Sequence, residues 1–176
     1  MDKILIVVDM QKDFIDGALG TLEAVAIVPN VAEKISQFQG KIFATLDTHP
    51  ENYMDTSEGK KLPVPHCIKG EPGWELDKAV AAALEKKDYT LVEKPTFGSL
   101  ELPELIRAAA NGKPSEIELM GLCTDICVVS NALILKAAFP DAEISVDASL
   151  CAGVTPQSHN AALDVMKMCQ INVLGR

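Results

Sequence analysis

The sequence predicts one α/β domain over residues 1–176, with a doubly wound, mostly parallel six-stranded sheet and helices on both faces. Short apolar runs alternate with longer segments of helical pattern, which is typical of parallel strands joined by crossover helices. The runs place Val, Ile and Leu at successive positions, as strands covered on both faces do. A chain of 176 residues that is 48% hydrophobic and 23% charged can form one domain with a substantial core.

The expected elements follow the chain in alternation. The strands cover residues 4–8, 42–47, 90–93, 117–120, 144–147 and 172–174. The helices cover residues 28–39, 74–85, 102–111, 125–138 and 155–168. Two segments, 47–73 and 95–100, do not fit this pattern. Because loops longer than about 12 to 15 residues are usually functional or disordered, the segment 47–73 is a candidate part of a site.

Composition excludes several classes of partner. A formal charge of -9 disfavours nucleic acid and anionic membranes, which repel an acidic protein. No apolar run approaches the roughly 20 residues that cross a bilayer. The start, MDKILIVVDMQKDF, has no pattern of a secretion signal, and five cysteines do not resemble a paired disulfide framework. We therefore expect a cytoplasmic protein, and we expect a homo-oligomer, although the sequence does not determine the number of subunits.

Four chemically notable positions lie at the ends of predicted strands. They are Asp9, Asp47, Lys94 and Gly121. In open α/β sheets, ligands bind beyond the carboxyl ends of the strands. We therefore expect these four positions to converge on one rim of the sheet.

Cys127 lies in the stretch GLCTDICVVSNAL, in the first turn of a predicted helix. There the helix dipole and unpaired backbone N–H groups stabilise a thiolate, and the same N–H groups could hold an oxyanion. A free cysteine is more often a small buried hydrophobe, which is our interpretation of Cys67, Cys151 and Cys169. For Cys127, position alone leaves both interpretations open.

Asp9 and Lys94 each end or follow an apolar strand. A buried lysine needs a charge partner, because an unpaired ammonium in a low dielectric is very costly. A carboxylate and an amine on the same rim as Cys127 form a plausible catalytic group. The alternative, that Asp9 and Lys94 are only an ion pair between strands, has equal weight at this point.

A second group of residues has the chemistry of a metal site. Asp47, His49, Glu58 and His66 all lie at the start of the irregular segment or within it. An aspartate with two histidines suits divalent Zn, Mn or Fe. The spacing is loose, and the alternative is that the histidines only hydrogen-bond the loop. His159, on a predicted helix, is given no function.

Taken together, the motifs resemble one known family. They are IVVDMQKDF at the start, DTH followed by PHCIKG, VEKPTFGS in the middle and GLCTDICV before the fourth helix. In order and spacing they resemble the isochorismatase-like cysteine hydrolase superfamily, and within it the nicotinamidase/pyrazinamidase-like branch. The resemblance covers nearly the whole chain.

The resemblance implies roles for the rim residues. It makes Asp9 the base, Lys94 its charged partner and Cys127 the nucleophile. It also implies a cis peptide between Leu122 and Cys123, which places the backbone N–H of Cys123 beside that of Cys127 in an oxyanion hole. Family enzymes that hydrolyse the enol ether isochorismate lack this cysteine, so its presence favours amide chemistry.

The resemblance also implies a divalent metal ion held by Asp47, His49 and His66. The fourth ligand varies among nicotinamidases, and here it is Glu58, with Asp55 as the alternative. The metal is Zn, Mn or Fe.

The expected substrate wall departs from the family pattern. Many nicotinamidases carry a tryptophan shortly before the position of His66, where this chain has LPVP. Phe14 matches the opposite aromatic wall, and Phe97 or Trp74 is expected to supply the missing ring. The departure affects the identity of the substrate more than the type of reaction.

The resulting hypothesis is hydrolysis of a small-molecule, nicotinamide-like amide to a carboxylic acid and ammonia through a cysteine thioester. One alternative is a metal-independent amidase of the same superfamily that acts on carbamoyl or ureido compounds. Another is a non-catalytic binding protein on the same fold. A nucleotide-binding α/β protein is disfavoured, because neither GxGxxG nor GxxxxGK[ST] follows a predicted strand.

Overall fold

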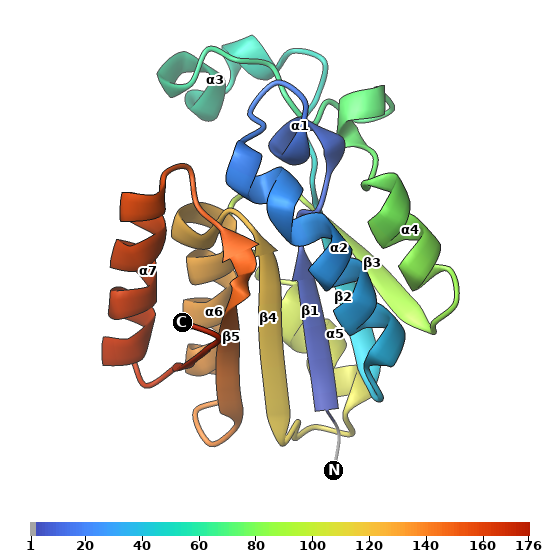
Figure 1. Ribbon diagram of the computed structural model, residues 1–176, viewed down its shortest axis with the longest axis vertical. Coiled ribbons are helices and arrows are strands. Elements are labelled where there is room, and N and C mark those ends of the chain that lie inside the picture. Colours follow the sequence, from blue (N-terminus) through green and yellow to red (C-terminus); the bar gives the residue numbers. More distant parts are fainter. Residues whose placement is uncertain (1–2) are drawn as a thin grey trace.

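The computed structural model describes residues 3–176 and contains a six-stranded sheet. The strand order is β3-β2-β1-β4-β5-β6, and every neighbouring pair is parallel. The strands are β1 (Lys3–Val8), β2 (Lys41–Asp47), β3 (Tyr89–Lys94), β4 (Glu116–Leu122), β5 (Glu143–Ala152) and β6 (Asn172–Leu174). The predicted doubly wound α/β fold is confirmed (Figure 1).

Helices cover both faces of the sheet (Figure 1). On the face nearer the viewer lies α2 (Leu22–Gln37), which packs against α4 (Lys78–Leu84). Behind the sheet lie α5 (Leu102–Ala109) and α6 (Val129–Ala138), and α6 contacts α7 (Pro156–Met168). Right-handed crossovers explain this division, since the chain moves in one direction from β1 to β3 and in the other from β4 to β6.

Two helices differ in extent from their predictions. Helix α2 begins at Leu22, ahead of the expected 28–39, because the Thr21 hydroxyl accepts the Ala24 N–H at 3.0 Å and caps the helix there. Pro29 lies inside this helix, where it removes one backbone donor. The expected helix 74–85 is shorter, since Asp77 caps α4 by accepting N–H groups from the first turn.

The region around β4 and β5 also differs from prediction. The expected helix 125–138 divides into a π-helical turn, η3 (Thr124–Val128), and the α-helix α6. Single π-helical turns are frequent at functional sites. Strand β5 runs on to Ala152, past the expected end at residue 147, because its second half pairs with the end of β4 after a register shift.

The irregular segment 47–73 contains short helices that were not predicted. They are η1 (Tyr53–Asp55), α3 (Ser57–Lys61) and the start of η2 (Pro72–Trp74), and α1 (Lys12–Ile15) is a further short helix after β1. Figure 1 shows α1 and α3 above the carboxyl ends of the strands. Within residues 3–176, no helix is long and apolar enough to span a membrane.

Gly121 allows the two central strands to approach at the end of β4. Its φ is +117°, and a Cβ there would lie 2.1 Å from the carbonyl oxygen of Val8. Strand order reverses between β1 and β4, and the crevice at such a switch point is where doubly wound sheets bind ligands. The residues of the candidate site follow these strands.

Candidate active site

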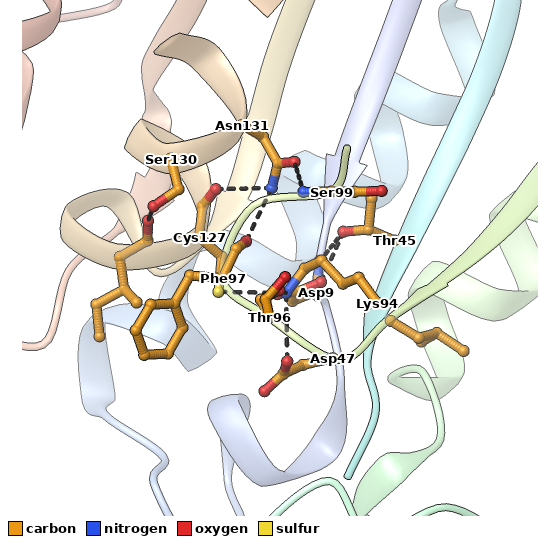
Figure 2. A network of polar contacts seen from close by, with 12 residues as sticks. Asp9, Thr45, Asp47, Lys94, Thr96, Phe97, Ser99, Cys127, Ser130 and Asn131 are labelled. Atoms are coloured by element: carbon orange, nitrogen blue, oxygen red, sulfur yellow. Dashed lines mark hydrogen bonds and ion pairs between the residues drawn. The ribbon is translucent and has the colours of Figure 1, made fainter. Parts of the chain in front are cut away.

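Four buried residues, Asp9, Asp47, Lys94 and Cys127, form a group at the carboxyl edge of the sheet, which we call the Lys94 cluster. Asp9 follows β1, Lys94 ends β3, and Cys127 lies in η3 after β4. Asp47 ends β2 directly opposite Lys94 in the strand register. The side chains of these four residues point toward one another in Figure 2. The ends of β1, β2 and β3 therefore converge in the structure, as the sequence predicted.

The Lys94 ammonium is at the centre of this cluster. Its Nζ lies 2.6 Å from Asp9 Oδ2, 3.3 Å from Asp47 Oδ1 and 3.4 Å from Cys127 Sγ. It also donates to the carbonyl oxygen of Thr96 at 3.2 Å. All of these side-chain partners are buried. The charge partner that the sequence required for Lys94 is thus a pair of carboxylates.

Electrostatics keep Lys94 charged and Asp9 basic. Burial alone would lower the pKa of Lys94, but Asp9, Cys127 and Asp47 outweigh it and raise the pKa. Burial raises the pKa of Asp9, and the Lys94 ammonium opposes this shift without cancelling it. The Thr45 hydroxyl donates to Asp9 Oδ1 at 2.6 Å and fixes the carboxylate in place. Asp9 is therefore a more basic carboxylate than an exposed one.

The surroundings of Cys127 oppose ionisation of its thiol, whereas the sequence predicted only the stabilising effect of a helix N-terminus on the thiolate. Its side chain is only 3% exposed. Burial raises the pKa of the Cys127 thiol well above its ordinary value, Asp9 raises it further, and Lys94 lowers it. The Lys94 ammonium favours the thiolate, but burial and the Asp9 carboxylate outweigh it. The environment of Cys127 therefore favours the protonated thiol.

The peptide bond between Leu122 and Cys123 is cis, the conformation that the family resemblance implies. It lies between the end of β4 and η3, so it joins the central sheet to the turn that carries Cys127. Cys123 and Cys127 both line the same cavity. Both residues are thus part of the wall of one cavity.

Four side chains form a second group, which we call the histidine cluster. One ligand atom from each of Asp47, His49, Glu58 and His66 lies within 4.8 Å of the others. His49 Nε2 is 2.9 Å from Asp47 Oδ2, and His66 Nε2 is 3.7 Å from the same oxygen. Glu58 Oε1 lies 3.8 Å from His49 Nε2 and 3.7 Å from His66 Nε2. Glu58, and not the alternative Asp55, is the fourth member of this group.

The chemistry of the histidine cluster fits a divalent cation. His66 Nδ1 donates to the carbonyl oxygen of Val64 at 2.8 Å, which directs its Nε2 toward Asp47 and Glu58. Burial lowers the pKa of His66, but Asp47 and Glu58 raise it overall. The cluster therefore favours added positive charge, which a proton or a metal ion can supply. Its nitrogen and oxygen atoms suit Zn, Mn or Fe.

Both clusters meet at a cavity of about 550 Å³, within the range of small-molecule sites. Phe14 and Phe97 line this cavity, and the Phe14 ring lies 5.5 Å from the His66 ring. Phe97 is 44% exposed. The remaining apolar lining residues are Leu19, Pro50, Leu62, Pro95 and Ile126.

Trp74 is the one expected wall residue that the structure places elsewhere. Within the described chain, Trp74 is not part of the cavity lining. Its indole N–H donates to Thr48 Oγ1 at 2.9 Å, and Lys69 Nζ lies 5.9 Å from its ring centroid. Trp74 therefore contacts Thr48, a lining residue, without lining the cavity itself.

Sequence reasoning missed several buried polar residues that hold the clusters. Gln11 accepts the Asp47 N–H at 2.8 Å and donates to the Asp47 carbonyl oxygen at 2.9 Å. Tyr53 packs edge-on against His49 and His66. The sequence could have identified Thr45, because a polar residue inside an apolar strand indicates a buried polar contact. No sequence pattern indicated that Tyr53 would pack against the two histidines.

Comparisons with known proteins agree with this geometry. The Isochorismatase domain family matches residues 3–175. An isochorismatase family protein of Bacillus subtilis is 30% identical over 144 residues, which are 76% of this chain and 78% of the relative.

The chain is also similar to solved structures over nearly its whole length. The pyrazinamidase of Pyrococcus horikoshii, solved with zinc, is 28% identical, covers 100% of both chains and has a TM-score of 0.80. The pyrazinamidase/nicotinamidase of Streptococcus mutans is also 28% identical, with a TM-score of 0.85 over 98% of this chain and 100% of its own. From the family match over residues 3–175, we conclude that the chain belongs to the isochorismatase family.

Proposed function

We propose that this protein hydrolyses a small-molecule amide to a carboxylic acid and ammonia, with Cys127 as nucleophile. The observation that carries the proposal is the Lys94 cluster. A lysine lies 2.6 Å from a buried carboxylate and 3.4 Å from a cysteine sulfur, and that cysteine lines the cavity. A nucleophile with an adjacent base and an orienting charge is the pattern of covalent catalysis. Relatives named nicotinamidase or pyrazinamidase support the choice of an amide.

In the first step Asp9 accepts the thiol proton of Cys127, and the sulfur attacks the carbonyl carbon of the amide. Lys94 remains protonated and stabilises the ionised form of Asp9 before the transfer. The negative charge that develops on the carbonyl oxygen is stabilised by the backbone N–H groups of Cys123 and Cys127. The raised pKa of Asp9 makes the carboxylate a better base for this step.

In the second half of the reaction the proton leaves Asp9. It passes to the leaving nitrogen, so that ammonia departs and a thioester remains on Cys127. A water molecule then attacks the thioester carbon while Asp9 accepts one of its protons. Return of that proton to the sulfur restores the Cys127 thiol and releases the acid.

Asp47, His49, Glu58 and His66 would hold a divalent metal ion in the same cavity. A bound ion supplies a Lewis acid that can orient a ring nitrogen of the substrate or a water molecule. The zinc in the pyrazinamidase of Pyrococcus horikoshii supports zinc here, and the donor atoms also suit Mn and Fe. Phe14 and Phe97 would contact the faces of an aromatic substrate.

The test is ammonia release by the purified protein from a panel of amides, with and without a chelator. The panel contains nicotinamide, pyrazinamide and several carbamoyl and ureido compounds. We expect turnover of a ring amide and a loss of rate with the chelator. Turnover of a carbamoyl compound that the chelator does not affect would favour the metal-independent amidase. No turnover of any amide by folded, metal-loaded protein would overturn the proposal in favour of a binding protein.

A further inference from the structure

Asn131 is a fully buried polar side chain on helix α6. Its Nδ2 donates to the carbonyl oxygen of Cys127 at 2.8 Å and to that of Phe97 at 3.1 Å. Its Oδ1 accepts the backbone N–H of Ser99 at 2.9 Å. Figure 2 shows this one amide between the turn that carries Cys127 and the strand-to-helix connection that carries Phe97 and Ser99. Asn131 therefore joins two segments of the site that are far apart in sequence.

The connection between β3 and α5, residues 95–101, contributes to both functions of the cavity. The carbonyl oxygen of Thr96 accepts a hydrogen bond from Lys94 Nζ at 3.2 Å. The side chain of Phe97 lines the cavity beside Cys127. A displacement of this connection would thus change both a contact of Lys94 and the substrate wall.

The connection packs closely on α6 but has few polar ties to it. A Cβ on Gly98 would lie 2.4 Å from Ile134 Cδ1, so the backbone approaches the helix closely at this point. Among residues 3–176, the hydrogen bonds between the connection and α6 all come from Asn131. Because these partners are backbone groups, Asn131 controls the position of the chain and not of one side chain.

We infer that Asn131 is a positioning residue for the proposed reaction. It fixes the 95–101 connection to helix α6 and to the turn that carries Cys127. The distance between the Phe97 side chain and Cys127 is thereby kept constant. The inference rests on the proposed function, because it assigns Asn131 a role in substrate binding at that site. Buried amides that satisfy several backbone groups at once are expensive to replace, since each lost partner is left without a hydrogen bond.

The test variant is Asn131→Ser. A helical serine can donate to the carbonyl oxygen four residues earlier, as Ser130 does to Ile126 at 2.6 Å. Asn131→Ser can therefore keep the bond to Cys127, but it is too short to reach Phe97 or Ser99. Asn131→Thr has the same hydroxyl with an additional methyl group, and it replaces the serine variant if that one does not fold.

The matched control is Ser130→Ala. It removes a side-chain hydrogen bond at the adjacent position of the same helix, from Ser130 to the carbonyl oxygen of Ile126. It keeps the Cβ that faces Gly98 and leaves the bonds of Asn131 to the connection in place. Any effect that Asn131→Ser shows and Ser130→Ala lacks is thus due to the link with residues 95–101.

Two measurements are made on each variant. Hydrogen–deuterium exchange reports on the connection, including the Ser99 amide, independently of any activity. Steady-state kinetics on the amide that the wild type hydrolyses give kcat and KM separately. For Asn131→Ser we expect faster exchange over residues 95–101 and a KM raised about fivefold or more, the equivalent of one ordinary hydrogen bond. Ser130→Ala should match the wild type in both.

The KM distinguishes positioning from a purely structural role. A variant that only lost stability would contain less active enzyme, which lowers the apparent kcat and leaves KM unchanged. Faster exchange with an unchanged KM would therefore overturn the positioning role, and unchanged exchange would overturn the link itself. If the wild type hydrolyses no amide, the proposed function fails and with it the role in substrate binding, whereas the exchange result still decides the link.

Discussion

The Lys94 cluster and the histidine cluster meet at Asp47, yet different parts of the chain hold them. Asp9 and Lys94 lie at strand ends, where the hydrogen bonds of the sheet fix the backbone. His49, Glu58 and His66 come from the segment 47–73, which contains only short helices and an isolated bridge between His49 and Ile68.

This difference has a physical consequence. In the Lys94 cluster an internal ammonium forms ion pairs with Asp9 at 2.6 Å and with Asp47 at 3.3 Å. The histidine cluster places two carboxylates around two imidazoles, and these carboxylates raise the pKa of His66. The first cluster therefore contains its own positive charge, whereas the second has none and would be stabilised by an added cation. We expect chemistry to depend on the first and metal-linked stability on the second.

The largest expected effect is the loss of activity in Cys127→Ala. Removing a nucleophile removes nearly the whole chemical step, so we expect a fall in kcat of about 10⁴-fold or more. Metal content and thermal stability should stay close to those of the wild type, because Cys127 is not part of the histidine cluster. Cys169→Ala is the control, since Cys169 is exposed. Substantial amidase activity in folded Cys127→Ala would refute the cysteine mechanism.

The second effect is a loss of metal-linked stability in His66→Ala. A metal present at about 100 times its Kd stabilises the folded state by about 2.7 kcal/mol. A chelator should therefore lower the thermal unfolding temperature of the wild type and of Cys127→Ala, but not that of His66→Ala. Elemental analysis of protein purified without nickel gives the metal content directly. A wild type with no bound metal and no response to added Zn, Mn or Fe would contradict the site.

The third effect is a shift of the acid limb of the pH profile in Thr45→Val. Asp9 must be ionised to accept the thiol proton, so kcat/KM falls as the pH falls through the pKa of Asp9. The hydrogen bond from Thr45 lowers that pKa, and its removal raises it. The acid limb should then move to higher pH. Thr90→Val, on an exposed part of β3, is the control. A limb that stays in place would argue against Asp9 as the base.

The strand ends were predictable because buried parallel strands have a simple signal. A continuous aliphatic run that stops at a charged residue identifies both the strand and its end, as in β1 before Asp9. The signal was weaker for β3, an edge strand with sequence YTLVEK that is partly exposed. The short helix α3 and the packing of Tyr53 on His49 had no such signal. They depend on contacts within the segment 47–73, among them the Tyr53 hydroxyl donating to the Leu62 carbonyl oxygen at 2.9 Å.

Predictions about the environment of a residue were less successful than predictions about its location. Cys127 lies in the first helical turn, as expected, but burial makes its thiol hard to ionise. The sequence shows that a helix begins there and does not show how deeply the turn is covered. Trp74 illustrates the same limit, because its position near the site did not reveal which way its ring points.

The smallest expected effect is that of Trp74→Phe. The change removes the hydrogen bond to Thr48 but no part of the cavity lining, so KM should stay within about twofold of the wild type, well below the tenfold that 1.4 kcal/mol represents. Phe14→Leu is the comparison, because Phe14 lines the cavity against the His66 ring. Loss of an aromatic contact of about 1 kcal/mol should raise its KM about fivefold. Equal increases of KM in both variants would indicate that Trp74 contacts the substrate, the role that the family resemblance offered to Phe97 or Trp74.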